Sequence, residues 1–331
     1  MPIDRPLTLS CNSYDVTAAL LDGTVTADGY TLRTQTGADI SRLFEQVVRD
    51  RAFDVAELGF TFLARTMSAD NPPFYALPVF LVRRLQHSTT YINVNAGIET
   101  PADLAGKTVG EFATFGHDMG VWPKGIWADE YGLSVHQSRW IVGGVTHPMA
   151  PMDFLTVRHA PGVSVEAVPE GQTLGPMLES GEISALISAL PPAGLGTDAT
   201  NVRRLFPDYE KREADYYSRT GIFPIMHLVV VKRDLIDADP GLARALFTAF
   251  EAAKSTAIDT HNAGGTDAGV NPWFAQLIGP NGQLVDDGRW DYGVAKNRHA
   301  VDTFLRYHHD QGLSDRLLTA EDIFPAELMD T

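Results

Sequence analysis

The run PIMHLVVVKRD at residues 224–234 is long and apolar, which is typical of a buried strand. FYALPVFLVRR at residues 74–84 is a second run of the same kind. The two runs bracket a segment with its own strand and helix signals, which indicates that the chain crosses twice between two lobes. We therefore predict a two-lobe α/β fold, with residues 1–85 and 225–331 forming lobe one and residues 86–224 forming an inserted lobe two.

Strand and helix signals alternate through the first 85 residues. LTLSC (7–11) and GYTLRTQT (29–36) have strand character, and FDVAE (53–57) is a third, shorter strand. Apolar residues from Ile40 onward are spaced as on one face of a helix. This order predicts a parallel sheet with right-handed crossovers. Folds of this kind bind ligands in the cleft between lobes, beside the C-terminal ends of strands.

The chain is strongly acidic, and its charge limits the partners that we expect. Its 331 residues include 42 Asp and Glu against 26 Lys and Arg, which gives a formal net charge of −16. Nucleic acids and anionic membranes attract clustered Lys and Arg, so we expect neither as a partner. An anionic small molecule would need local positive groups in its binding site.

The N-terminal sequence MPIDRPLTLSCNSYD has neither the basic region nor the apolar run of an export signal. No stretch of the sequence approaches the 18 consecutive apolar residues that a membrane-spanning helix needs. Cys11 is the single cysteine, so the chain forms no internal disulfide. We expect a cytoplasmic protein, and the sequence leaves open whether it forms a homo-oligomer.

Cofactor and metal motifs are missing from the sequence or lack their context. GLGTDA (194–199) matches a dinucleotide-binding pattern, but two prolines precede it and no helical spacing follows. AGKT (105–108) resembles the end of a phosphate loop, but Pro101 stands where that loop needs glycine. The ten histidines show no zinc-binding spacing. We expect neither a metal nor an organic cofactor, with Glu57 and Asp118 as oxygen ligands of a divalent ion as the alternative.

The segment YYSRTGIFPIMH (216–227) places Arg219 and Thr220 immediately before the second long strand and His227 within it. A lone histidine on a strand is more often a core residue than a functional one. On a strand that crosses between lobes, the two interpretations have equal weight. A planar guanidinium holds a carboxylate through two parallel hydrogen bonds, so Arg219 is a candidate anchor for an anion. The alternative for Arg219 is a surface ion pair.

Three segments carry a resemblance to a known family: RLFPDYEKREADYYSRTGIFPIMHLVVVKRD (204–234), PEGQTLGPMLESGEISALIS (169–188) and VWPKGIWADEYGL (121–133). Together they resemble the 4,5-dihydroxyphthalate decarboxylase family, and the same order of motifs extends from FDVAEL (53–58) to the last helices. That family is related in fold to type II periplasmic solute-binding proteins. The resemblance implies loss of one carboxylate from 4,5-dihydroxyphthalate to give protocatechuate, without an organic cofactor.

The chain departs from the family pattern at two places. Lys124 stands where arginine is more common, and Gly59-Phe60-Thr61 lacks an expected serine. Both departures leave the exact substrate open among hydroxylated aromatic carboxylates. The alternative from another class of protein is a non-catalytic solute-binding protein for an aromatic carboxylate. The missing export signal argues against this alternative, because such receptors work outside the cytoplasm.

The implied reaction requires a proton donor, a group that faces the phenol, and cations for two carboxylates. His227 is suited to be the donor because histidine titrates near neutral pH. Glu57, at the C-terminal end of a first-lobe strand, is the expected acceptor, and its alternative is an N-cap or first-turn carboxylate of the following helix. The loop 114–118 is expected to open a helix whose N–H groups favour an anion. The side chains that we expect to contact the substrate are Arg219, Thr220, Lys124, Arg83, His117, Trp122 and Tyr14.

Overall fold

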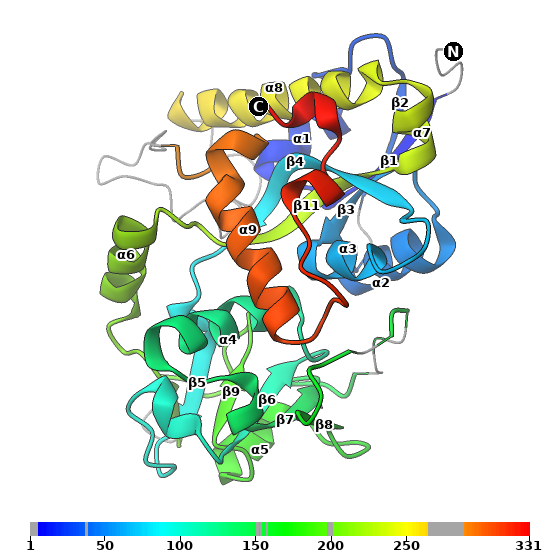
Figure 1. Cartoon of the computed structure of the whole chain (residues 1–331). Coiled ribbons are helices and arrows are strands. Elements are labelled where there is room, and N and C mark those ends of the chain that lie inside the picture. The colour runs from blue at the N-terminus through cyan, green and yellow to red at the C-terminus, as the bar shows by residue number, and fades with distance from the viewer. Residues whose placement is uncertain are drawn as a thin grey trace. The chain divides into compact units, whose positions relative to one another are not determined.

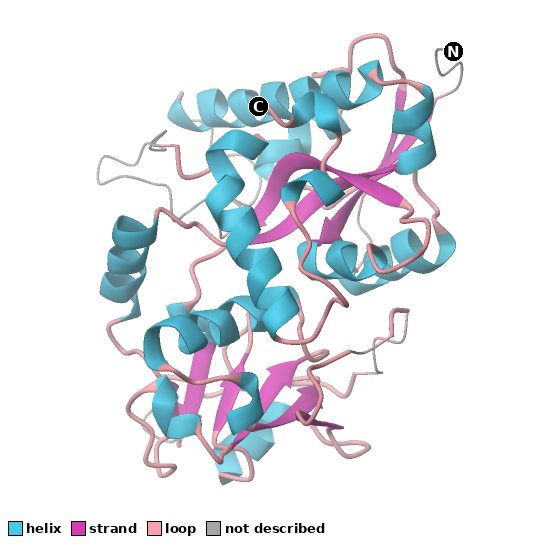
Figure 2. Cartoon of the chain, viewed as in Figure 1, coloured by secondary structure: helices cyan, strands magenta, loops and turns pink. Residues whose placement is uncertain are grey.

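The computed structural model divides the chain into two compact units. Unit 1 consists of Met1–Arg84, Ile225–Asp302 and Leu318–Thr331, and unit 2 consists of Leu85–Pro224 and Thr303–Leu317. The structure describes residues 6–36, 39–149, 152, 154–156, 158–196, 201–263 and 288–331. Residues 197–199 of the GLGTDA pattern lie outside the described residues. Figure 1 follows the chain through its elements, and Figure 2 distinguishes helices from strands.

A five-stranded sheet forms the centre of unit 1, in the order β2-β1-β3-β11-β4. β1 (Leu7–Ser10) runs parallel to β2 (Leu32–Gln35) and to β3 (Val55–Gly59). β11 (Ile225–Lys232) is antiparallel to both β3 and β4 (Phe74–Arg83). The two long apolar runs are therefore neighbouring strands. Burial of nearly every residue in them explains why their sequences are continuously apolar and do not alternate.

The helices of unit 1 follow the apolar spacing of their sequences. α2 (Ile40–Glu45) continues as a π-helical turn (Gln46–Asp50), and the two bury Leu43, Phe44 and Val47, as the spacing predicts. The 22-residue helix α8 (Gly241–Asn262) packs against α1 (Asp15–Leu21). The other helical segments of unit 1 are α3 (Phe60–Thr66), α7 (Arg233–Ala238), α10 (Ala320–Ile323), η6 (Ala326–Leu328) and the first part of α9 (Val294–Asp310).

Unit 2 has a six-stranded sheet of its own, in the order β10-β5-β9-β6-β7-β8. Its strands are β5 (Thr90–Asn93), β6 (Thr108–Phe112), β7 (Arg139–Gly143), β8 (Ser164–Ala167), β9 (Ala185–Ile187) and β10 (Val202–Arg204). The four strands β9, β6, β7 and β8 are parallel, whereas β5 is antiparallel to β9 and to β10. The carboxyl ends of the four parallel strands therefore lie along one edge of the sheet.

The helices of unit 2 include the last part of α9, which we predicted to lie in lobe one. They are η2 (His87–Thr89), η3 (Pro101–Leu104), α4 (Asp118–Tyr131), η4 (Val135–Gln137), α5 (Leu174–Ser180), α6 (Tyr209–Thr220) and the last part of α9. Residues 303–317 join unit 2 because Phe304 and Tyr307 pack on Trp122 of α4, with ring centroids 5.6 Å and 5.8 Å away. Across the described ranges, no helix combines the length and the apolar character needed to cross a membrane.

Candidate functional site

Tyr14, Glu57 and His227 come together at the edge of the unit 1 sheet where β1 and β3 end. Because β1 and β3 are parallel, the residues that follow β1 lie beside the last residues of β3. β11 is antiparallel to β3, so its first residues lie at the same edge. In the register of these two strands, His227 is opposite Gly59 and Glu57 is opposite Val229. His227 and Glu57 are thus diagonal neighbours on one face of the sheet, within reach of each other.

The Glu57 carboxylate lies at the centre of this cluster. Glu57 has 0 % exposure. Its Oε1 atom accepts a hydrogen bond from the Tyr14 hydroxyl at 2.7 Å and lies 2.8 Å from Nδ1 of His227. Its Oε2 atom accepts the backbone N–H of Asn12 at 2.9 Å. A carboxylate with a hydroxyl and an amide already donating to it acts as an acceptor toward the imidazole, so Nδ1 carries the proton of this bond. Nε2 is then the ring nitrogen that can exchange a proton with a ligand.

His227 differs from Glu57 in that it retains some contact with solvent. Its side chain is 14 % exposed, while that of Glu57 is fully covered. The imidazole also meets the ring of Phe44 edge to face, with centroids 5.1 Å apart. The carboxylate and the phenylalanine together fix the orientation of the imidazole. A fixed, partly exposed imidazole backed by a buried carboxylate is suited to general acid–base chemistry.

Tyr14 contributes a hydroxyl that stays protonated. Burial and the neighbouring Glu57 carboxylate raise the pKa of this phenol well above its usual value. The backbone around it is held by Thr17, whose Oγ1 accepts the Tyr14 N–H at 2.9 Å and donates to the Asn12 carbonyl at 3.0 Å. Tyr14 therefore acts as a donor that completes the hydrogen bonding of Glu57.

The predicted role of Glu57 as an acceptor facing a phenol does not match this geometry. Its carboxylate has no exposed surface, and both of its oxygens already face donors from Asn12, Tyr14 and His227. The arrangement supports a different role, in which Glu57 orients the His227 ring. The alternative of an N-cap or first-turn carboxylate for Glu57 also differs from the structure, because the N-cap of α3 is Gly59 and the helix begins at Phe60.

Cys11 lies next to this cluster, at the end of β1. Burial, with a smaller contribution from the Glu57 carboxylate, raises the pKa of its thiol far above the usual range. A thiol acts as a nucleophile in its thiolate form. Cys11 is therefore a buried core residue with the wrong protonation state for covalent chemistry.

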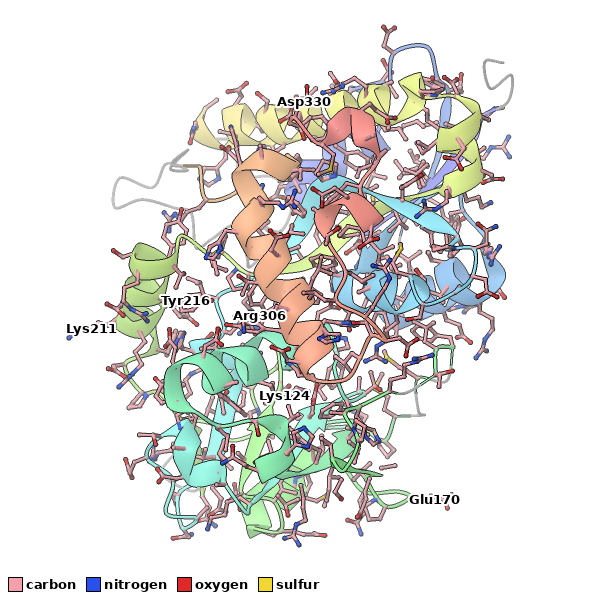
Figure 3. All side chains as sticks on the ribbon, in the orientation of Figure 1. Lys124, Glu170, Lys211, Tyr216, Arg306 and Asp330 are labelled. Carbon is pink, nitrogen blue, oxygen red and sulfur yellow. The ribbon has the colours of Figure 1, made fainter. Side chains whose placement is uncertain are left out.

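Lys124 and Glu111 form a buried ion pair in unit 2. Their side chains are each 1 % exposed, and Lys124 Nζ lies 2.5 Å from Glu111 Oε2. The ammonium also lies over the rings of Phe115 and Trp140, at 3.7 Å and 4.9 Å from the centroids. Figure 3 labels Lys124 on α4. The structure thus gives this predicted carboxylate anchor an internal partner.

Two further predicted contact residues have structural roles at α4. His117 is the N-cap of the helix, and its Nδ1 accepts the Met119 N–H at 3.4 Å. The loop 114–118 opens this helix, as the sequence predicts. Trp122 is fully buried against the rings of Phe304 and Tyr307. Its indole therefore belongs to the core of unit 2.

Arg219 and Thr220 end α6, and Arg219 forms the surface ion pairs of the alternative interpretation. Its side chain is 50 % exposed and contacts Glu130 at 2.8 Å and Asp215 at 2.7 Å. Thr220 Oγ1 donates to the carbonyl of Tyr216 at 2.7 Å. Exposed ion pairs of this kind are weak, so a guanidinium held in them can change partners at little cost.

Arg83 is buried at the end of β4. Its guanidinium donates to Oδ1 of Asn297 at 2.5 Å and to the Asp291 carbonyl at 3.1 Å, and it lies over the ring of Phe80. These contacts tie β4 to the first turn of α9 and to the segment that precedes it. Arg83 is therefore a structural residue of unit 1.

A pocket of about 590 Å³ opens in unit 2 at the carboxyl ends of its parallel strands. Ala113 and Thr114 follow β6, Gly143 ends β7, and Val168 follows β8. Its other described lining residues include Met149, Met152, Glu166, Glu170 and Gln172. The walls combine apolar side chains with hydrogen-bond acceptors, which suits a small ligand with both characters.

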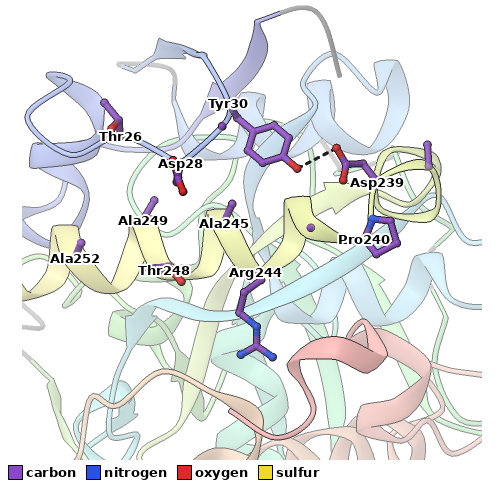
Figure 4. A pocket seen from close by; sticks show the side chains of 13 residues that line it. Thr26, Asp28, Tyr30, Asp239, Pro240, Arg244, Ala245, Thr248, Ala249 and Ala252 are labelled. Carbon is purple, nitrogen blue, oxygen red and sulfur yellow. Dashed lines mark hydrogen bonds between the residues drawn. The ribbon is translucent and has the colours of Figure 1, made fainter. Parts of the chain in front are cut away.

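A second hollow, of about 900 Å³, lies in unit 1 between the loop 26–30 and helix α8. Figure 4 shows the hydrogen bond from the Tyr30 hydroxyl to Asp239 at one end of it, at 2.9 Å. The loop precedes β2, so the hollow lies toward the opposite sheet edge from Tyr14 and Glu57. Arg244, which also lines it, pairs with Asp330. Among the described residues, no group of three or more His, Cys, Asp or Glu is placed to hold a metal ion.

The sequence did not indicate three groups that complete the candidate site. The Asn12 N–H, Thr17 and Phe44 all act through contacts with Tyr14, Glu57 or His227. A backbone N–H and a ring contact leave no signature in a single sequence. The loop after β1 was the one available signal, because loops at the ends of parallel strands often line ligand sites.

Comparison with known proteins gives two kinds of similarity. The chain is 32% identical, over 97% of its own length and of the relative's, to 4,5-dihydroxyphthalate decarboxylase of Comamonas testosteroni. It is 28% identical to the protein of the same name from Pseudomonas putida, over 64% of this chain and 81% of the relative. No model of a protein family matches the chain.

The solved structures show the fold. A periplasmic sulfonate-binding protein from Methylobacillus flagellatus matches with a TM-score of 0.52 at 12% identity, over 98% of this chain and 93% of that one. An Archaeoglobus fulgidus protein also matches with a TM-score of 0.52, at 11% identity over 93% of this chain and 98% of that one. The predicted fold of the periplasmic-binding-protein type is confirmed.

Proposed function

This chain belongs to the 4,5-dihydroxyphthalate decarboxylase family, and we propose that it removes one carboxylate from 4,5-dihydroxyphthalate to give protocatechuate. The observation that carries the proposal is the similarity over 97% of both chains. The Tyr14–Glu57–His227 cluster supports it, because it supplies the acid–base group that such a reaction needs.

His227 is the proposed proton donor. In its protonated form the imidazole holds one N–H toward Glu57 and presents the other, on Nε2, for transfer. The proton adds to the ring carbon that bears the leaving carboxylate. The hydroxyl para to that carbon gives its proton to solvent, so that the ring becomes a dienone. The carbon–carbon bond then breaks, CO2 leaves, its bonding electrons restore the aromatic ring, and the phenol regains a proton. One proton is consumed in each turnover.

Glu57 and Tyr14 are proposed to support this transfer without contacting the reacting atoms. The carboxylate holds Nδ1–H and stabilises the imidazolium, and the Tyr14 hydroxyl keeps the carboxylate in place. Among the predicted anchors, Arg219 and its neighbour Thr220 remain the proposed contacts for a substrate carboxylate. Arg219 is preferred because its ion pairs are exposed and exchangeable, whereas Lys124 and Arg83 are buried with internal partners.

We further propose that the reaction needs no organic cofactor and takes place in the cytoplasm. The para hydroxyl accepts the charge that develops in the ring, so the substrate supplies its own electron sink. Self-association into a homo-oligomer also remains a proposal. Gel filtration with light scattering measures the oligomeric state, and dialysis against a strong chelator tests the need for a metal ion.

A second candidate is a non-catalytic binding protein for an aromatic carboxylate, which the fold similarity to a sulfonate-binding protein favours. Incubation with 4,5-dihydroxyphthalate separates the two. The decarboxylase is supported if CO2 and protocatechuate form in equal amounts, at many turnovers per chain, and if His227→Gln loses this activity. Tight binding by calorimetry without release of CO2 would support the receptor. A parallel screen of hydroxylated phthalates and benzoates identifies the preferred substrate.

A further inference from the structure

The buried pair of Glu111 and Lys124 is built into the start of α4. Glu111 belongs to β6, and Lys124 lies in the second turn of the helix that follows. The two oxygens of Glu111 have separate partners. Oε2 binds the Lys124 ammonium at 2.5 Å, and Oε1 accepts the backbone N–H of Gly116 at 2.8 Å. The carboxylate therefore connects the helix to the loop 113–117 that leads into it.

This loop has a conformation that needs such support. Ala113 has a φ of 66°, in the left-handed region that residues other than glycine seldom adopt, and Gly116 has a φ of 73°. Between them, Phe115 is fully buried with its ring 3.7 Å from the ammonium of Lys124. Glu111 thus binds the loop backbone, while Lys124 packs on the ring in the middle of the loop.

The sequence of α4 leaves room for the Glu111 carboxylate. A Cβ atom added to Gly120 would lie 1.6 Å from Glu111 Oε1. The helix can lie against the carboxylate because residue 120 has no side chain. Glycine is otherwise unfavourable inside a helix. Its presence here indicates that contact with the buried carboxylate outweighs that cost.

The loop that the pair holds borders the unit 2 pocket. Ala113 and Thr114 line the pocket at the carboxyl end of β6. The Ala113 N–H donates to the carbonyl of Gly143, which ends β7 and also lines the pocket. The His117 N–H donates to the carbonyl of Thr114 and so joins the loop to the helix cap. A change in the loop would therefore move one wall of the pocket.

We infer that Lys124 and Glu111 are positioning residues that fix the loop 113–117, and that Lys124 does not bind a substrate carboxylate. The catalytic part of this inference rests on the proposed decarboxylase function. The structural part does not depend on it. A carboxylate bound to Lys124 would have to displace Glu111 and reach the ammonium of a side chain that is 1 % exposed.

Two variants distinguish a positioning residue from an anchor. Lys124→Met leaves the Glu111 carboxylate buried without its cation. Glu111→Gln combined with Lys124→Met removes both charges and keeps an oxygen for the Gly116 N–H. If the pair positions the loop, Lys124→Met lowers kcat/KM for 4,5-dihydroxyphthalate roughly 10- to 100-fold. The double variant then recovers to within about threefold of the wild-type value, because the loop hydrogen bond is restored without a buried unpaired charge.

An anchor gives the opposite result in the double variant. With no cation at residue 124, KM stays raised by about tenfold or more whatever stands at residue 111. That outcome overturns the inference. If Lys124→Met alone fails to fold, the double variant still decides, because the two hypotheses differ in its KM.

Hydrogen exchange of the backbone amides tests the same inference without any assay of activity. Peptides that cover residues 112–119 are expected to exchange at least tenfold faster in Lys124→Met than in the wild-type protein, and to regain protection in the double variant. Unchanged protection in Lys124→Met would contradict the inference. Absence of decarboxylation in the wild-type protein, with this exchange pattern intact, would instead contradict the proposed function alone.

Discussion

Two buried carboxylates each face a basic side chain, Glu57 beside His227 in unit 1 and Glu111 beside Lys124 in unit 2. The distances are alike, 2.8 Å and 2.5 Å. The bases differ in exposure, since the His227 side chain is 14 % exposed and that of Lys124 is 1 % exposed. A carboxylate–base pair with an accessible base can move a proton to a ligand. A pair with an enclosed base stabilises the structure around it.

The contacts behind each base reinforce this difference. The Lys124 ammonium is covered by two aromatic rings as well as by Glu111. The His227 ring packs nearly perpendicular to the Phe44 ring and contacts Glu57 through Nδ1. Nε2 is then the nitrogen that can exchange a proton with a ligand. Exposure of the partner, more than burial of the carboxylate, therefore separates the proposed acid–base pair from the positioning pair.

Replacement of His227 by glutamine is expected to have the largest effect on catalysis. The variant keeps a hydrogen-bond donor near Glu57 but cannot transfer a proton near neutral pH, so kcat should fall roughly 10²- to 10⁴-fold. The melting temperature should change little, since the ring is partly exposed. His136→Gln, at an exposed position of unit 2, is the matched control. A kcat within tenfold of the wild-type value would remove His227 from the proposed role.

The positioning pair should show its effect in stability. Lys124→Met leaves a buried carboxylate without its cation and is expected to lower the free energy of unfolding by about 3–5 kcal/mol. Urea unfolding monitored by circular dichroism measures this change. Lys211→Met, an exposed lysine on α6, should change the free energy of unfolding by less than about 0.5 kcal/mol. Equal stability of the two variants would show that the Glu111 pair contributes nothing.

The sequence predicted the fold and the members of the unit 1 cluster, but not their contacts. An apolar run of about ten residues leaves few alternatives to a buried strand, so residues 74–84 and 224–234 could be predicted as strands. His227, Glu57 and Tyr14 were each named as candidates. Their meeting depends on the pairing of β3 with β11, between residues 170 positions apart. A single sequence contains no signal for such a pairing.

The roles of the cationic residues could not be predicted for a different reason. A lysine or arginine has the same sequence signature whether it meets a ligand or an internal carboxylate. Glu111 occupies a strand position with apolar neighbours, and the loop and helix that follow this strand bring Lys124 into contact with it. For Arg219 both interpretations were open, and the structure places it in surface ion pairs.

A third basic side chain, His87 of unit 2, extends the comparison because it is buried. It packs on the rings of Phe206 and Tyr216, with centroids 5.3 Å and 5.7 Å away. Burial lowers the pKa of His87 from 6.5 to about 4, with Arg212 and Arg219 adding to the shift and Glu130 opposing it. The unfolded chain therefore binds this proton at a higher pH than the folded chain.

Neutral His87 makes its full contribution to the free energy of unfolding above pH 6.5, and this contribution is lost as the pH falls toward 4. The loss amounts to roughly 3 kcal/mol at 1.36 kcal/mol for each pKa unit. Urea unfolding between pH 7 and pH 4.5 measures it in the wild-type protein and in His87→Phe. The variant should lose less stability over this range, because its ring cannot take a proton. Identical slopes in the two proteins would mean that folding leaves the pKa of His87 unchanged.

The smallest effect is expected at Cys11, which lies beside Glu57 but is enclosed as Lys124 is. Its thiol is buried, and burial together with the nearby carboxylate raises its pKa, so the thiolate needed for nucleophilic chemistry is disfavoured. Cys11→Ala should keep kcat/KM within about threefold and lower the free energy of unfolding by only about 1 kcal/mol, for the loss of packing. Treatment of the folded wild-type protein with iodoacetamide should likewise leave activity intact, because the reagent requires an accessible thiolate. Cys11→Ala could instead lose activity as fully as His227→Gln while its fold and stability are preserved. That result would mean that proximity to Glu57 activates the thiol. Exposure would then fail to distinguish functional from structural neighbours of the Glu57 carboxylate.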